Sequence, residues 1–151
     1  MPEAIQDRIP HNHCFGCGPL NPRGLAIKSY PDGDGTLCTF QPAAHHMAGP
    51  THVLNGGIIA TVIDCHAVCT AIADAYRTAG REIGTAPLIW CVTASLKIDY
   101  LAPTPIDAPC ELRARVREAR GRKRIVECAL SSGGTVRARA EVVAVEVPPS
   151  W

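Results

Sequence analysis

The sequence predicts an α+β fold in which one long helix is wrapped by a curved antiparallel sheet of about six strands. Residues 54–76 are apolar on almost every side over helical length, so other structure must enclose them. Two alternating, strand-like segments precede this stretch and four follow it, most of them joined by short turns. Because the long helix stands alone, it is expected to pack on one face of the sheet.

Composition limits what this chain can do. Its 151 residues suffice for one domain with a substantial core. A formal net charge of +1 and an aromatic content of 5% argue against a nucleic-acid partner. Asp64, His66 and Asp74 interrupt the apolar helix, so a membrane partner is not expected. The first residues lack the basic start and apolar core of a signal peptide, which favours a cytoplasmic location.

The first 24 residues are rich in turn formers and are expected to be irregular. Cys14 and Cys17 form a C-x-x-C pair that could be half of a zinc site. Structural zinc usually takes two such pairs and the sequence has no second one, so we expect an ordered loop without metal. The eight cysteines are expected to be reduced thiols, with Cys65 and Cys69 packing on one helix face.

Two strands and a loop are expected before the helix. Residues 25–30 alternate, residues 31–35 are turn formers, and residues 36–41 predict the second strand. The loop of residues 42–53 holds three histidines that we expect to be solvated or satisfied within the loop, namely His45, His46 and His52.

The helix is expected to begin at Gly56, after Asn55 as its N-cap, and to end near residues 77–80. Gly56 and Gly57 leave the backbone bare at the N-terminus, where N–H groups favour an anion or a carbonyl oxygen. Asp64 is a carboxylate among apolar neighbours, and such groups concentrate at functional sites. Two alternatives stay open here: a structural carboxylate bonded to a hydroxyl or a helix N-terminus, and glycines that only make a tight turn.

Helix geometry suggests a shared site. Gly56 and Asp64 are eight residues apart, which is about 12 Å along a helix. One substrate atom cannot meet both groups of the same helix. If both act on one atom, two copies of the helix must face each other, which predicts a dimer.

Four strands are expected after the helix. Residues 88–101 alternate, with an apolar face that includes Trp90 and Tyr100, and with Thr93 on the opposite face. Prolines end this strand. Short glycine-containing turns separate the last strands, which are expected at residues 110–119, 124–130 and 135–147.

Three stretches resemble one known family. They are C-F-G-C-G with N-P-x-G-L at residues 14–25, G-G-x(6)-D at residues 56–64, and T-A-S-L-K-I-D-Y-L-A-P at residues 93–103. In this order and spacing the chain is similar to the hotdog-fold acyl-CoA thioesterases of the phenylacetate-pathway-like (PaaI-like) branch. The whole chain would then be a single hotdog domain.

This resemblance implies hydrolysis of acyl-CoA thioesters at sites shared across a homodimer, often within a homotetramer. It implies no metal, and no cofactor beyond the coenzyme A of the substrate. Asp64 matches the catalytic carboxylate, as general base or as nucleophile. The N–H of Gly56 matches the backbone donor to the thioester oxygen, and Thr93 matches a residue that helps to place the water.

Two positions depart from the family pattern. Many relatives carry His where this chain has Asn55, and some carry Asn where it has Gly49. Asn55 stays in the candidate catalytic set, because its side chain can still hold a local hydrogen bond. Gly57 is a candidate contact for coenzyme A. A basic band is either a solvated face or a source of phosphate contacts, with Arg122 and Lys123 preferred; it comprises Arg113, Arg115, Arg117, Arg120, Arg122, Lys123 and Arg124.

Two other functions remain possible for the same fold. One is a non-catalytic module that binds acyl-CoA and regulates. The other is an enoyl-CoA hydratase or dehydratase, which needs a histidine together with a carboxylate across the interface. The three loop histidines could supply that residue only if the loop folds inward.

Overall fold

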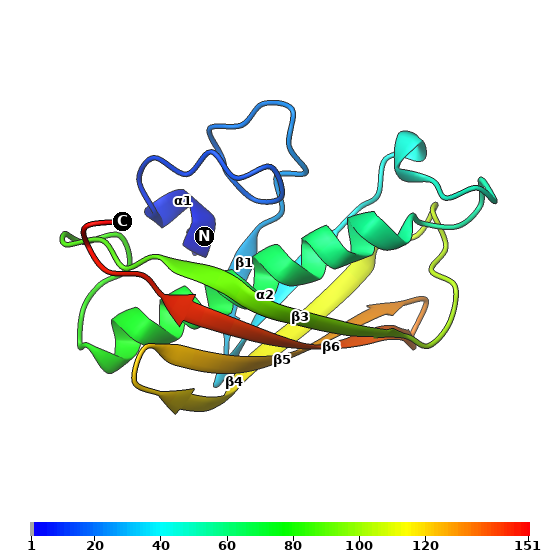
Figure 1. Ribbon diagram of the computed structural model, residues 1–151. Coiled ribbons are helices and arrows are strands. Elements are labelled where there is room, and N and C mark those ends of the chain that lie inside the picture. Colours follow the sequence, from blue (N-terminus) through cyan, green and yellow to red (C-terminus); the bar gives the residue numbers. More distant parts are fainter. Residues whose placement is uncertain (1) are drawn as a thin grey trace.

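A six-stranded antiparallel sheet curls round one long helix (Figure 1). The structure is a computed structural model that describes residues 2–151. The strand order across the sheet is β1-β2-β4-β5-β6-β3. The strands are β1 (Ser29–Asp32), β2 (Gly35–Phe40), β3 (Cys91–Tyr100), β4 (Cys110–Arg120), β5 (Lys123–Ser132) and β6 (Thr135–Glu146). This arrangement confirms the predicted α+β class and the hotdog fold.

The helix α2 (Gly56–Thr78) is capped as the sequence predicts. Asn55 Oδ1 accepts from the amides of Gly57 and Ile58 at 2.7 and 3.1 Å. Gly80 follows the last turn in the left-handed region, with a φ of +67°. Length and composition alone would suffice for a membrane span. In this fold the sheet wraps the helix and 12 of its 23 residues are buried, as expected of a core helix.

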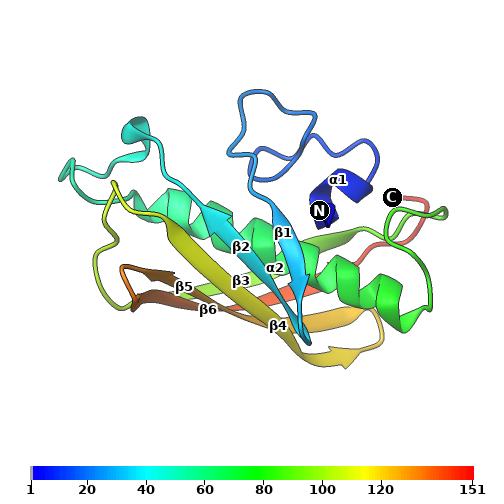
Figure 2. The same ribbon diagram turned by 180° about the vertical axis from the view of Figure 1, so that it is seen from behind.

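One face of the sheet is buried against α2 and the other is charged. In β4, Leu112 and Ala114 point toward the helix and are at most 5% exposed, whereas Arg113 and Arg115 point away and are exposed. The cyan β2 and the yellow β4 cross the same side of α2, as seen from behind in Figure 2. This alternation was predicted, because a sheet with one buried face repeats every second residue.

The N-terminal segment is more ordered than predicted. It contains a one-turn helix, α1 (Ile5–Arg8), whose Ile5 is fully buried in the core. The loop that follows lies along the side of α2 that the sheet leaves open (Figures 1 and 2). The strand expected at residues 25–30 begins only at Ser29, because Ala26 adopts a left-handed conformation with a φ of +53°.

The single apolar face predicted for the strand after the helix is wrong, because a β-bulge interrupts β3. The pairing register with β6 shifts just after Thr93. Before the shift, Cys91 is buried in the core and Thr93 reaches α2. After it, Ile98 packs against the core and Tyr100 contacts the start of the helix. The extra residue at the bulge reverses which side chains face the helix.

Candidate active site

Asp64 and Thr93 meet where α2 passes β3. Thr93 Oγ1 donates to Asp64 Oδ1 at 2.6 Å. Asp64 comes from the third turn of the helix, and Thr93 from the residue at which the β3 register shifts. Bulges are common beside active sites, where they re-aim a side chain. The structure therefore brings together two residues that the sequence singles out separately.

The surroundings of Asp64 favour its neutral form more than water would. Desolvation raises the pKa of its carboxyl group above the ordinary value, and the sulfur of Cys17 raises it further. The hydrogen bond from Thr93 opposes this shift, because it stabilises the ionised form. Oδ2 of Asp64 accepts no hydrogen bond from any residue of the described chain, 2–151. That oxygen is open to accept a proton from a bound water.

The start of α2 presents one uncommitted amide. The N–H groups of Gly57 and Ile58 donate to Asn55, whereas the N–H of Gly56 has no acceptor within residues 2–151. Tyr100 Oη donates to the carbonyl of Gly56 at 2.7 Å and fixes this turn against β3. The backbone donor expected at Gly56 is thus geometrically available. Asn55 acts here as the helix cap, and the N–H of Gly57 already donates to the side chain of Asn55.

The groups at the two ends of this helix segment do not converge within one chain. Gly56 and Asp64 lie on the same helix, about 12 Å apart along its axis at 1.5 Å per residue. Between them, Gly57 and Thr61 are exposed or half-buried, on the same side as Asp64. The chain therefore presents an open stripe with a donor at one end and a carboxylate further along.

Comparison with known proteins identifies the family. The sequence model of the thioesterase superfamily matches residues 51–138, more than half of the chain. This chain belongs to the thioesterase superfamily. A crystal structure of a thioesterase superfamily protein from Shewanella loihica PV-4 is 38% identical, covers 91% of this chain and 96% of its own, and has a TM-score of 0.70.

Curated relatives carry a more specific name. Acyl-coenzyme A thioesterase THEM4 of Rattus norvegicus is 28% identical over 115 residues, 75% of this chain and 44% of that protein. This chain thus spans less than half the length of that relative. The PaaI protein from the phenylacetic acid degradation operon of E. coli is 14% identical, with 82% of this chain and 81% of its own covered and a TM-score of 0.67, which supports the fold alone.

Most of the basic band is committed to ion pairs in this superfamily member. Arg117 pairs with Glu127 and Glu141 at 3.3 and 2.8 Å. Arg124, which the sequence placed in a solvent or phosphate-binding band, is instead only 4% exposed and bonds Asp74 Oδ2 of α2 at 2.9 Å. Arg124 is therefore an internal link between helix and sheet.

Arg122 and Lys123 differ from the rest of the band. Both are exposed, Arg122 in the β4–β5 turn and Lys123 as the first residue of β5, and neither forms an ion pair within residues 2–151. Lys123 and Val92 both pair with Val145 of β6, so the turn lies level with the start of β3. Two strand spacings, about 10 Å, separate them.

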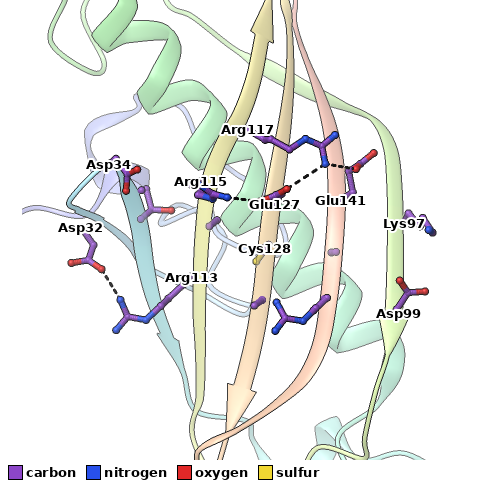
Figure 3. A pocket seen from close by; sticks show the side chains of 16 residues that line it. Asp32, Asp34, Lys97, Asp99, Arg113, Arg115, Arg117, Glu127, Cys128 and Glu141 are labelled. Atoms are coloured by element: carbon purple, nitrogen blue, oxygen red, sulfur yellow. Dashed lines mark hydrogen bonds and ion pairs between the residues drawn. The ribbon is translucent and has the colours of Figure 1, made fainter.

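A charged hollow of about 660 Å³ lies on the outer face of the sheet, away from Asp64 (Figure 3). Five carboxylates and five basic side chains line it, and several pair with one another. One such pair joins Arg113 to Asp32 at 2.8 Å. Because these formal charges balance, the hollow has no excess of positive charge to attract an anionic ligand.

The histidines divide into two groups. His45 and His46 belong to the 3-10 turn η1 (Ala44–His46), and His46 accepts from the amide of Ala43. No hydrogen bond or ion pair of residues 2–151 joins a loop histidine to Asp64. His66, to which the sequence gave no role, is fully buried and hydrogen-bonds Ser29 at 2.7 Å. Burial lowers its pKa to about 4, so its imidazole is neutral at pH 7.

The cysteines of the N-terminal loop and the helix form one cluster. The sulfur atoms of Cys14, Cys17 and Cys65 all lie within 4.8 Å of one another. A loop without metal is expected from the sequence because the chain has no second C-x-x-C. Cys65 comes next to this loop only in the folded chain, so the spacing of the cysteines along the sequence does not reveal the cluster.

Proposed function

We propose that this protein hydrolyses acyl-CoA thioesters and that Asp64 is the carboxylate on which the reaction depends. The hydrogen-bonded pair of Asp64 and Thr93 on an open helix face carries the proposal. Membership of the thioesterase superfamily and the name of the curated relatives support thioester hydrolysis as the reaction class.

The chemistry follows from the two ends of the open stripe. As a general base, Asp64 takes a proton from water while the water oxygen bonds to the thioester carbon. The carbonyl oxygen gains negative charge and accepts the N–H of Gly56, the uncommitted donor. The carbon–sulfur bond then breaks, and coenzyme A leaves as a thiol once the proton returns. In the alternative, Asp64 attacks the carbon directly and water hydrolyses the resulting anhydride.

A homodimer would bring the Gly56 N–H of one chain near the Asp64 carboxylate of the other. Two such dimers would then assemble into a homotetramer. Strand β3 lies at one edge of the sheet, and no strand within residues 2–151 pairs with its outer side. Its apolar residues are unusually open: Leu96 is 37% exposed and Tyr100 is 53% exposed. Edge strands are commonly covered by pairing with another chain. Pairing two copies through β3 would place the helix of one copy beside that of the other.

The coenzyme A phosphates need basic partners near the helix N-terminus or the β3 edge. Arg122 and Lys123 are exposed and outside the ion-pair network, and arginine forks suit phosphate. We therefore assign them the phosphate contacts. Eight free thiols are compatible with a reducing compartment, so we also propose a cytoplasmic location.

A thiol-release assay tests the function. Purified protein is incubated with short-chain, long-chain and aryl acyl-CoA esters, and free coenzyme A is measured. Asp64→Asn should lower kcat by about 100-fold or more, the usual range for a lost general base. Asp99→Asn, which changes an exposed carboxylate on the outer face of the same strand as Thr93, is the matched control and should retain activity.

Two outcomes would replace the proposal. Tight binding of acyl-CoA without thiol release from any ester would favour the regulatory module. Hydration of an enoyl-CoA without thiol release would favour the hydratase.

A further inference from the structure

The cysteine cluster joins the N-terminal loop to the central helix. Cys14 Sγ and Cys65 Sγ are 3.6 Å apart, and Cys17 Sγ lies within 4.8 Å of both. Cys69 is one turn further along α2 than Cys65, and the neighbouring Cys17 raises the pKa of its thiol. Two cysteines of the loop and one of the helix thus bring their sulfur atoms together, and Cys69 lies on the next turn of the same helix face.

Two glycines of the loop allow the cysteine sulfur atoms to come this close. A Cβ at Gly16 would collide with Cys65 Sγ, and a Cβ at Gly18 would collide with the amide of Cys14. The amide of Gly18 donates to the carbonyl of Cys14 at 2.8 Å, which closes the C-x-x-C turn. Only glycine at both positions lets the loop pack this closely on the helix.

The cluster differs from the other buried cysteines of the chain. Desolvation raises the pKa of Cys91 and Cys128 to about 12, as for apolar packing residues. Cys17 instead lies beside other sulfur atoms, because those of Cys14 and Cys65 are within 4.8 Å of its own. Asn12 Nδ2 also lies 4.0 Å from that sulfur, as an outer donor. Several thiols gathered at one place are the arrangement by which proteins bind zinc.

We propose that Cys14, Cys17, Cys65 and Cys69 bind one zinc ion. Four sulfur atoms at about 2.3 Å from a tetrahedral zinc are about 3.8 Å from one another. The 3.6 Å between Cys14 and Cys65 is close to that value, whereas Cys69 Sγ lies outside the group of three and would have to move closer to bind the same ion. A disulfide would join only two of these sulfur atoms, so it would not explain why the others lie beside them.

Such a site would be structural. It has four protein ligands and no open position for substrate. It would fasten the N-terminal loop to α2 at Cys65, one residue from Asp64. The metal would then hold the loop beside the helix face that carries Asp64.

The test measures metal content directly. Untagged protein, purified under reducing conditions and dialysed, should contain about one zinc per chain by elemental analysis. Replacement of zinc by Co²⁺ should give the sulfur-to-cobalt charge-transfer bands and ligand-field bands of tetrahedral thiolate coordination. Cys17→Ser should lower the zinc content at least tenfold. Cys128→Ala, which removes a buried thiol from β5, should keep one equivalent.

The wild-type protein alone can overturn the proposal. It fails if reduced protein incubated with Zn²⁺ and then dialysed holds under a tenth of an equivalent and gives no cobalt–thiolate bands. It also fails if peptide mapping by mass spectrometry finds a disulfide between Cys14 and Cys65. An organomercurial titration that releases one zinc per chain supports the site even if Cys17→Ser does not fold. A Co²⁺ spectrum unchanged by Cys69→Ser would remove that residue from the ligand set.

Discussion

A single hydrogen bond ties together the two residues of greatest interest. Asp64 was identifiable from the sequence, because a carboxylate within an apolar helix is costly unless it has a use. The position of Thr93 was not, because strict alternation turns its side chain to the wrong face. The β3 bulge determines that orientation, and the alternation of polar and apolar residues does not predict a bulge.

Removing the hydroxyl of Thr93 should shift the pH dependence of the reaction. Its hydrogen bond holds the pKa of Asp64 down against desolvation, so Thr93→Val should raise that pKa further. Since Asp64 must be ionised to act, activity falls as the pH drops through its pKa. The acidic limb of kcat/KM against pH should therefore move to higher pH in Thr93→Val. Thr93→Ser keeps the hydroxyl and should stay close to wild type; an equal shift in both variants would contradict this role.

At the scale of the elements, the helix α2 has two features with different roles: the cap at its start, and the ion pair that joins it to the sheet. The sequence predicted the cap at Asn55, because capping depends on local residue types. It did not predict that Arg124 is internal. Arg124 sits within a run of arginines, and only the strand pairing of β5 turns this one toward the helix.

Gly56→Pro should remove the proposed oxyanion donor without breaking the helix. Proline is well tolerated at the first helical position, and Asn55 already has the extended conformation that proline requires before it, with a ψ of 133°. We expect kcat to fall by about 100-fold or more, the usual loss for one oxyanion donor. Gly56→Ala keeps the N–H and adds a Cβ only 3.6 Å from the Tyr100 ring, an ordinary contact.

Steady-state kinetics of the two variants decide the role of this amide. Gly56→Ala should retain most of the activity. Similar kcat values in Gly56→Pro and Gly56→Ala, with both proteins folded by circular dichroism, would show that the N–H is not used.

Arg124→Ala should be strongly destabilising. It removes from the carboxylate of Asp74, 11% exposed, its buried partner on β5 and leaves only the exposed Arg77 of the same helix. Breaking a buried ion pair from one side costs about 3 kcal/mol or more. Arg120→Ala breaks the exposed pair with Glu118 and should cost under about 1 kcal/mol. Urea denaturation measures both, and equal losses would show that the buried pair is not a main tie between helix and sheet.

At the scale of the whole molecule, the helix and strands were predicted better than the contacts between residues that lie far apart in the sequence. The four strands other than β1 and β3 begin and end within two residues of their predicted bounds. The cysteine cluster was beyond reach, because 51 residues separate Cys14 from Cys65 and only the fold brings them together. The shared site, in contrast, was inferred from the sequence, because the spacing of Gly56 and Asp64 along one helix is a local property.

Mixing two inactive variants tests whether the site is shared between subunits. In a shared site, Gly56 comes from one chain and Asp64 from the other. A dimer of one Gly56→Pro chain and one Asp64→Ala chain then has one intact site and one doubly altered site. After random exchange of subunits, activity should return to about a quarter of the wild-type level, because half of the dimers are mixed. If instead both groups act within one chain, no mixture contains an intact site. Activity that stays at the level of the separate variants, after mass spectrometry has verified exchange, would exclude the shared site.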